Sequence, residues 1–186
     1  MMGGLNMVCC FFGHRTINKT PELIQILSQI TEDLIVKAKV NIFLFGCNSE
    51  FDDLCYDTVT SLMDKYPYIK RIYVRAKFPY ISDEYKYHLS ERFEDTYYPE
   101  KVFNSGKASY VMRNQDMIDH SDFCLFYYDE NYMPPRRNNR SSSIMYQPRS
   151  GTEIAFKYAV KKNKRIINIA KKKRRVYKNP SFLKLL

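Results

Sequence analysis

The sequence lacks any apolar run of the roughly 18 residues needed to span a lipid bilayer. It also lacks, at its beginning, a basic segment followed by an apolar segment and a small-residue cleavage site, so no signal peptide is predicted. Its five cysteines show no Cys-x-x-Cys or Cys/His spacing of a metal site, and its three histidines are scattered. We therefore expect no membrane partner, no metal, no cofactor, and reduced cysteines in a cytoplasmic protein.

Acidic residues are absent from position 154 onward, where twelve lysines and arginines occur. Residues 1–153 carry 18 basic and 20 acidic side chains, a net charge of −2, although the whole chain has +10. The body is therefore not a basic nucleic-acid-binding module. Residues 171–186 are predicted to be a basic tail. Such a tail is commonly a solvated terminus, and the alternative is a contact with RNA, DNA or acidic lipid.

Short apolar runs alternate with amphipathic segments along the chain. The apolar runs predict strands, and apolar side chains at helical spacing predict helices between them. This alternation predicts an α/β fold: a Rossmann-like, open, mainly parallel sheet of about five strands with helices on both faces, in one domain over residues 1–170. The expected strands are 7–12, 40–45, 69–74, 123–128 and 165–170, and the expected helices are 21–37, 51–66, 110–119 and 150–162.

Two segments do not fit this alternation. Residues 76–108 hold many aromatic side chains without steady periodicity and are expected to be irregular. These aromatics either pack the segment onto the body or stack on a base. Residues 131–149 are rich in proline, arginine, asparagine and serine and are predicted to form a mobile loop. Its arginines are a hypothetical clamp over an anionic ligand: Arg136, Arg137, Arg140 and Arg149.

Glycine and polar residues follow the first two predicted strands. Gly13, His14 and Arg15 end the first, and Gly46 and Ser49 follow the second, with Asp52 in the next helix. In open α/β sheets, ligands bind beyond the carboxyl ends of the strands. Gly13 allows a sharp turn or a close backbone approach, and His14 and Arg15 supply donors and positive charge. The simpler interpretation is a turn that faces water.

A third feature at this edge is the expected helix start at Ser150-Gly151-Thr152. A helix start offers unpaired backbone N–H groups and a positive dipole end, so it is an anion site when nothing covers it. Arg113 and Asn114, before the fourth strand, are candidate partners of a phosphate. Taken alone, Ser-Gly-Thr before a helix is more often only a cap.

These motifs, in this order, resemble the SLOG superfamily, the Rossmann-like group of DprA/SMF proteins and LOG-type cytokinin-activating phosphoribohydrolases. The resemblance rests on Phe11-Phe12-Gly13-His14-Arg15, on Gly46 with Phe51-Asp52, on the stretch 113–122, on Ser150-Gly151-Thr152 and on 164–169, and so covers most of residues 7–170. The greatest likeness is to small bacterial and phage-type members that carry Gly-His-Arg. The resemblance implies a nucleotide-type ligand and favours a homo-oligomer.

The resemblance also shows a departure from the LOG enzymes. Their Pro-Gly-Gly-x-Gly-Thr-x-x-Glu motif binds phosphate and supplies a catalytic Glu three residues after the Thr. Here Gly151-Thr152 match, but Ala155 stands at the Glu position and Pro-Gly-Gly is absent. This departure counts against LOG-type hydrolysis. The remaining candidate general acids or bases are Asp122, Asp129 and Glu153, and carboxylates at such sites also serve as ribose acceptors or caps.

Three functions are consistent with the sequence. The first is a nucleotide-binding module or ligand sensor that uses the groups at the strand ends. The second is an enzyme that hydrolyses the N-glycosidic bond of a nucleotide. The third is a nucleic-acid-associated protein that acts through its basic tail only.

Overall fold

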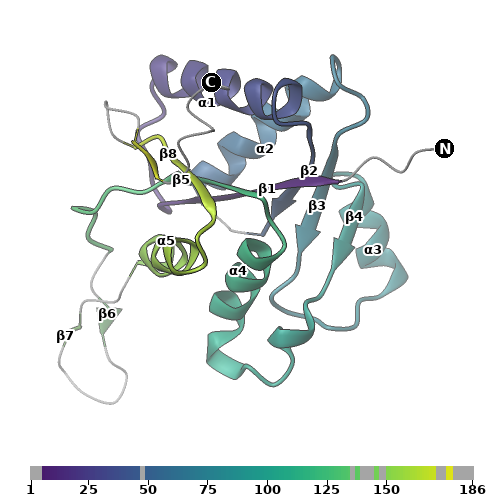
Figure 1. The fold of residues 1–186 in the computed structure, drawn as a ribbon. Coiled ribbons are helices and arrows are strands. Elements are labelled where there is room, and N and C mark those ends of the chain that lie inside the picture. Colours follow the sequence, from purple (N-terminus) through teal and green to yellow (C-terminus); the bar gives the residue numbers. More distant parts are fainter. Residues whose placement is uncertain are drawn as a thin grey trace.

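The structure, a computed structural model, describes residues 6–46, 49–134 and 150–170 and the backbone of short strands at 137–138, 145–146 and 175–177. Within this part of the chain, seven strands form one sheet in the order β4-β3-β2-β1-β5-β8-β9 (Figure 1). Neighbouring strands are parallel except β8 and β9. The strands are β1 (Met7–Gly13), β2 (Val40–Phe45), β3 (Lys70–Val74), β4 (Asp95–Tyr97), β5 (Phe123–Tyr127), β8 (Arg165–Asn168) and β9 (Arg175–Tyr177). The predicted Rossmann-like α/β fold with a mainly parallel sheet is confirmed.

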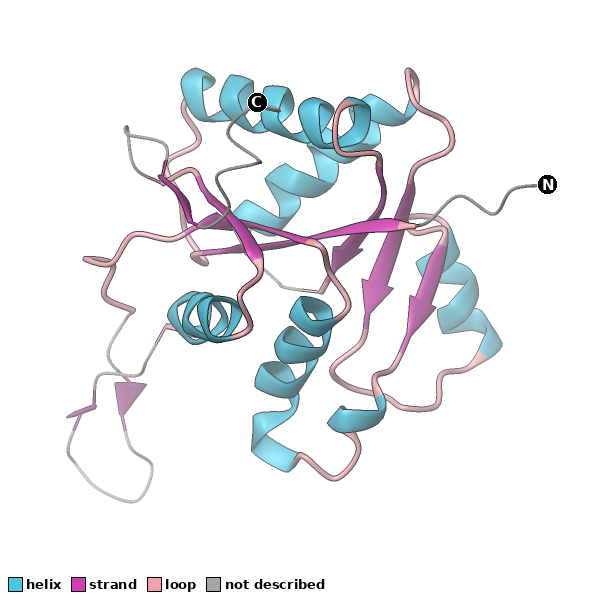
Figure 2. Cartoon of the chain, viewed as in Figure 1, coloured by secondary structure: helices cyan, strands magenta, loops and turns pink. Residues whose placement is uncertain are grey.

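Helices cover both faces of the sheet (Figure 2). Buried side chains of α1, α2 and α3 share one core cluster with the sheet, and those of α4 and α5 share the other. The crossovers therefore change face where the chain passes from β4 to β5. This change places β5 on the other side of β1 from β2. The helices are α1 (Pro21–Val36), α2 (Glu50–Met63), α3 (Asp83–Ser90), α4 (Ser109–Asp119) and α5 (Gly151–Lys161).

The central strand β1 is buried on both faces, as its unbroken apolar run predicts. Cys9 and Phe11 belong to the core under α1 and α2, whereas Cys10 and Phe12 belong to the core under α4 and α5. Each of these four side chains is at most 1% exposed. A strand with two apolar faces can occupy only the middle of such a sheet, so the run fixes the place of β1 in the fold.

Hydroxyl side chains cap the starts of α1, α2 and α5. Thr20 Oγ1 accepts the Leu23 amide at 3.2 Å, and Pro21 occupies the first helical position of α1. Ser49 and Ser150 cap α2 and α5 in the same way. Residues 150 and 49 therefore begin helices at the same edge of the sheet, where the parallel strands end.

The segment 76–108 is more regular than expected. It contains α3, β4 and two short 3₁₀ turns, Glu100–Val102 and Gly106–Ala108. Only Leu89 of α3 is buried, so this short helix leaves no periodic apolar stripe in the sequence. Among its aromatics, Phe93 is buried, whereas Tyr80 and Tyr87 are 86% and 70% exposed.

Two other predicted segments lie largely outside the described residues. Of the predicted mobile loop 131–149, the structure describes residues 131–134 and the backbone of β6 (Arg137–Asn138) and β7 (Met145–Tyr146), which pair antiparallel. The four arginines of the hypothetical clamp have no described side chains. Of the basic tail 171–186, only the backbone of β9 is described.

Candidate functional site

The strand order reverses between β1 and β5, and several of the predicted site residues lie at the carboxyl ends of these two strands. Gly13 is paired in register with Tyr127 at the end of β5. Thr152, in the first turn of α5, donates its hydroxyl hydrogen to the Gly13 carbonyl at 2.7 Å. This bond joins residues 139 positions apart, so the starts of α5 and of the β1–α1 loop are brought together as predicted.

Gly13 has a packing role at this point. A Cβ atom on Gly13 would overlap the side chain of Phe51, in the first turn of α2. The Phe51 ring is fully buried and lies 5.6 Å from the Tyr127 ring, measured between centroids. Absence of a side chain at position 13 therefore lets α2 begin directly over the ends of β1 and β5.

His14 is buried beside the end of β5. Its Nε2 atom lies 2.9 Å from the Asp129 backbone nitrogen and 3.2 Å from the Asp129 carbonyl oxygen, and its ring stacks on Tyr132 at 3.8 Å. Burial lowers the pKa of His14 and outweighs the opposing contacts with Asp129. The neutral ring accepts the shorter bond at Nε2, which puts the proton on Nδ1. Among the described residues, Nδ1 has no hydrogen-bond partner.

Arg15 and Asp129 flank this histidine. The Arg15 carbonyl accepts the Glu50 amide at 2.9 Å, and the Arg15 side chain is exposed. The Asp129 carboxylate accepts the backbone and side-chain N–H groups of Asn131, which closes a turn after β5. Both charged groups therefore remain at the carboxyl edge, with the arginine facing solvent.

The start of α5 is both a capped helix end and an accessible one, and the start of α2 is capped in the same way. Ser49 Oγ accepts the Asp52 amide at 3.1 Å, and Ser150 Oγ accepts the Glu153 amide at 3.4 Å, so both hydroxyls are helix caps. Gly151 is exposed, and no atom of the described residues lies within 4 Å of where its Cβ would be. The first turn of α5 is therefore accessible next to Gly151, where backbone N–H groups attract an anion.

Arg113 is buried and links the ends of two neighbouring strands through its guanidinium group. Its Nη1 donates to the carbonyl oxygens of Gly46 and, at 3.1 Å, Val74, which end β2 and β3. Its Nε donates to the Asn114 side chain at 2.8 Å. A Cβ on Gly46 would overlap the guanidinium, so this glycine admits the arginine. Arg113, at 2% exposure, thus fixes the strand ends and faces no open surface.

The three candidate catalytic carboxylates do not converge on one point of this edge. Asp122 accepts the Val8 amide at 2.9 Å, at the amino end of β1. Glu153 forms an ion pair with Lys157 one turn along α5, and that lysine is exposed. The structure therefore leaves Asp122 far from Gly13 and His14, and it pairs Glu153, in the first turn of α5, with a lysine of its own helix.

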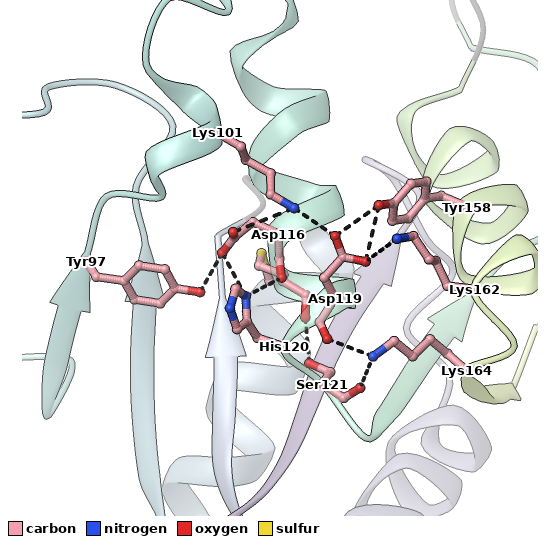
Figure 3. A network of polar contacts seen from close by, with 10 residues as sticks. Tyr97, Lys101, Asp116, Asp119, His120, Ser121, Tyr158, Lys162 and Lys164 are labelled. Atoms are coloured by element: carbon pink, nitrogen blue, oxygen red, sulfur yellow. Dashed lines mark hydrogen bonds and ion pairs between the residues drawn. The ribbon is translucent and has the colours of Figure 1, made fainter.

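The stretch 113–122 instead builds a polar cluster at the end of α4, which sequence reasoning missed (Figure 3). The Asp119 carboxylate accepts hydrogen bonds from Lys101 at 2.7 Å and from Tyr158, and lies 3.3 Å from Lys162. Lys164 donates to the Asp119 and Ser121 carbonyls. We call this set the Asp119 cluster; its other members are Tyr97, Asp116 and His120.

The Asp119 cluster has a structural explanation. Carboxylates near a helix C-terminus are disfavoured by the helix dipole, and here lysines offset that charge and bond the last carbonyls of α4. Burial acts to raise the pKa of Asp119, but the hydrogen bonds from Lys101 and Tyr158 outweigh it, so the pKa lies below its usual value. The Asp119 carboxylate ties the C-terminal end of α4 to the end of α5, away from the open α5 start.

The chain matches no protein-family model and no curated protein. In the part of the chain that the structure describes, no group of three or more histidine, cysteine, aspartate or glutamate side chains is arranged to hold a metal ion. Among the same residues, no helix has the length and apolar character of a membrane span.

Proposed function

We propose that the protein is a cytoplasmic, SLOG-type module that binds a nucleotide or nucleotide derivative at the carboxyl ends of β1 and β5. The reversal of strand order between these strands carries the proposal, because open α/β sheets bind ligands at such switch points. Gly13, His14, Asp129 and the start of α5 meet there. Four buried cysteines with free thiols are consistent with a reducing compartment.

The phosphate of this ligand is assigned to the first turn of α5. The open space at Gly151 lets an anion approach the backbone N–H groups, and the helix dipole favours negative charge there. Arg15, exposed at the same edge, adds a positive charge that pairs with phosphate. The backbone N–H groups next to Gly151 are thus the proposed anchor, and Ser150 and Thr152 hold the α5 start in place.

Binding without reaction is favoured over N-glycosidic hydrolysis. A hydrolase of this type needs a carboxylate at the scissile bond. Of the three candidates, Asp122 lies at the amino end of β1, Glu153 pairs with Lys157, and Asp129 lies beside His14. Its carboxylate is engaged by Asn131. A homo-oligomer and a nucleic-acid partner for residues 171–186 stay predictions. Exposed Ile24 and Val36 on α1 are consistent with self-association.

The test is a titration of the full chain with AMP and with ribose 5-phosphate, for the natural protein and for Gly151→Glu. The substitution places a carboxylate at the proposed phosphate position, and we expect AMP to bind about tenfold or more weakly, a loss of about 1.4 kcal/mol. A glutamate in the first turn favours the helix by about 0.3–1 kcal/mol, so unfolding would not explain the loss.

The matched control is Lys70→Gln, which changes the net charge by the same amount at the exposed amino end of β3. It should leave the AMP affinity unchanged. Equal AMP affinities for the natural protein and Gly151→Glu would contradict the phosphate assignment. Proton NMR of the same samples detects released base. A free-base signal that grows with time would show N-glycosidic hydrolysis and would contradict binding without reaction.

A further inference from the structure

A cavity of about 200 Å³ lies between α2 and α3, at the carboxyl ends of β2 and β3. Its floor is apolar: Phe45, the last residue of β2, is 1% exposed, and Phe93 is 8% exposed. The Phe93 ring stacks on Tyr73 with centroids 5.2 Å apart. An apolar, aromatic floor favours a flat ring over a sugar or a phosphate.

Polar groups stand around this floor. Tyr73 and Tyr85 line the cavity, and neither hydroxyl bonds to any residue that the structure describes. Burial raises the pKa of Tyr73, while Arg113 acts to lower it, so the phenol stays protonated and can donate or accept. The ring therefore meets hydroxyl groups that are still available for hydrogen bonds.

Charged groups of opposite sign face each other across the cavity. Asp52 and Asp53, in the first turn of α2, line one side, and His88, on α3, and Arg92, just after α3, line the other. Carboxylates accept hydrogen bonds from an exocyclic amine, and the guanidinium donates to ring nitrogens or a carbonyl. The same carboxylates repel a phosphate, so a phosphate of this ligand must lie elsewhere.

We propose that this cavity is the subsite for an amino-bearing nucleobase, namely adenine, cytosine or guanine. The proposal rests on the proposed function, because it assigns the base of the ligand whose phosphate lies at the α5 start. The cavity volume supports the division: it is below the roughly 300–1,000 Å³ of sites for larger ligands, so it suits a base and leaves ribose and phosphate outside.

The test uses phosphate-free ligands on the full chain. Saturation-transfer NMR with cytidine and uridine compares two nucleosides that differ by an amine against a carbonyl on the ring. We expect cytidine to bind about fivefold or more tightly than uridine, with the strongest transfer to its base protons. Asp53→Asn should narrow this preference, whereas Asp57→Asn, an exposed aspartate one turn along α2, should not.

The second variant removes an aromatic side chain that lines the cavity. Tyr85→Ala should weaken cytidine and AMP about tenfold, the usual scale for losing one base–aromatic contact. Its control is Tyr87→Ala on the same helix, since Tyr87 is 70% exposed and does not line the cavity. Thermal unfolding of both variants checks that α3 remains folded.

Failures of the two proposals are distinguishable. If Tyr85→Ala leaves AMP affinity unchanged while Gly151→Glu weakens it, the base subsite is wrong and the phosphate site stands. If Tyr85→Ala weakens AMP and Gly151→Glu does not, the cavity binds the base and the phosphate assignment is wrong. If neither nucleosides nor AMP bind the natural protein, both proposals are overturned.

Discussion

At the C-terminal end of α4, the Asp119 carboxylate is held by Lys101, Tyr158 and Lys162. At the carboxyl end of β1, by contrast, the buried His14 Nδ1 has no partner among the described residues. Buried polar groups are normally satisfied, and leaving one unbonded costs about 1–3 kcal/mol. The Asp119 cluster, whose polar groups are hydrogen-bonded, therefore stabilises the fold. At the carboxyl edge, which we call the unsaturated edge, a ligand can supply the missing hydrogen bond; the edge of the Asp119 cluster is the saturated edge.

The largest expected effect comes from breaking the saturated edge. Asp119→Ala removes the central acceptor and leaves three lysines near one another and the α4 end. We expect a loss of about 2 kcal/mol in the free energy of unfolding, since the side chain is only partly exposed. Urea denaturation measures it, with exposed Asp57→Ala as the control.

The same variant sharpens the comparison through ligand binding. AMP affinity of the folded Asp119→Ala protein should equal that of the natural protein, because the cluster lies at the other edge. A stability loss below about 0.5 kcal/mol would mean that the cluster is not the structural tie described here. A tenfold loss of AMP affinity without unfolding would mean that it takes part in the site.

Much of the fold follows from the sequence for simple physical reasons. The run Met7–Gly13 has two apolar faces, and Thr20-Pro21 starts a helix, because burial and capping are local properties. The short helix α3 and the strand β4 were missed, since a helix with one buried residue carries no stripe and a three-residue strand no alternation.

The site was harder to predict because side-chain contacts are not local. Arg113 donates to two main-chain carbonyls that are 39 and 67 residues away in the sequence. An arginine at this position was therefore predicted to contact phosphate, because the sequence does not show these distant acceptors. Asp122 follows α4 directly and reaches the amino end of β1. The α2–α3 cavity had one signal, the aromatic residues within 76–108, which sequence periodicity could not place.

A smaller expected effect is that His14 and Asp119 change the free energy of unfolding in different pH ranges. Burial depresses the pKa of His14 below its ordinary 6.5, so on acidification the unfolded chain takes up this proton first. Stability is then full above about pH 6.5 and falls below it. The depressed pKa of Asp119, ordinarily 3.8, gives a loss confined to lower pH, as that carboxylate protonates in the unfolded chain.

Unfolding free energies measured from pH 8 to pH 3 check this separation. His14→Gln should flatten the curve between pH 7 and pH 5 and leave the acid limb in place. Asp119→Asn should flatten the acid limb only. A His14→Gln curve parallel to that of the natural protein across pH 7 to 5 would contradict a buried, neutral His14.

The most direct test of the account is an amide chemical-shift map of the full chain titrated with AMP. Binding at the proposed site predicts shifts at residues 13–15, 49–53, 73, 85–93, 129–132 and 150–153, which lie at the carboxyl edge and around the α2–α3 cavity. It predicts none at 116–122 or 158–164, where the Asp119 cluster lies. Shifts centred on the Asp119 cluster, or no shifts at saturating AMP, would contradict it.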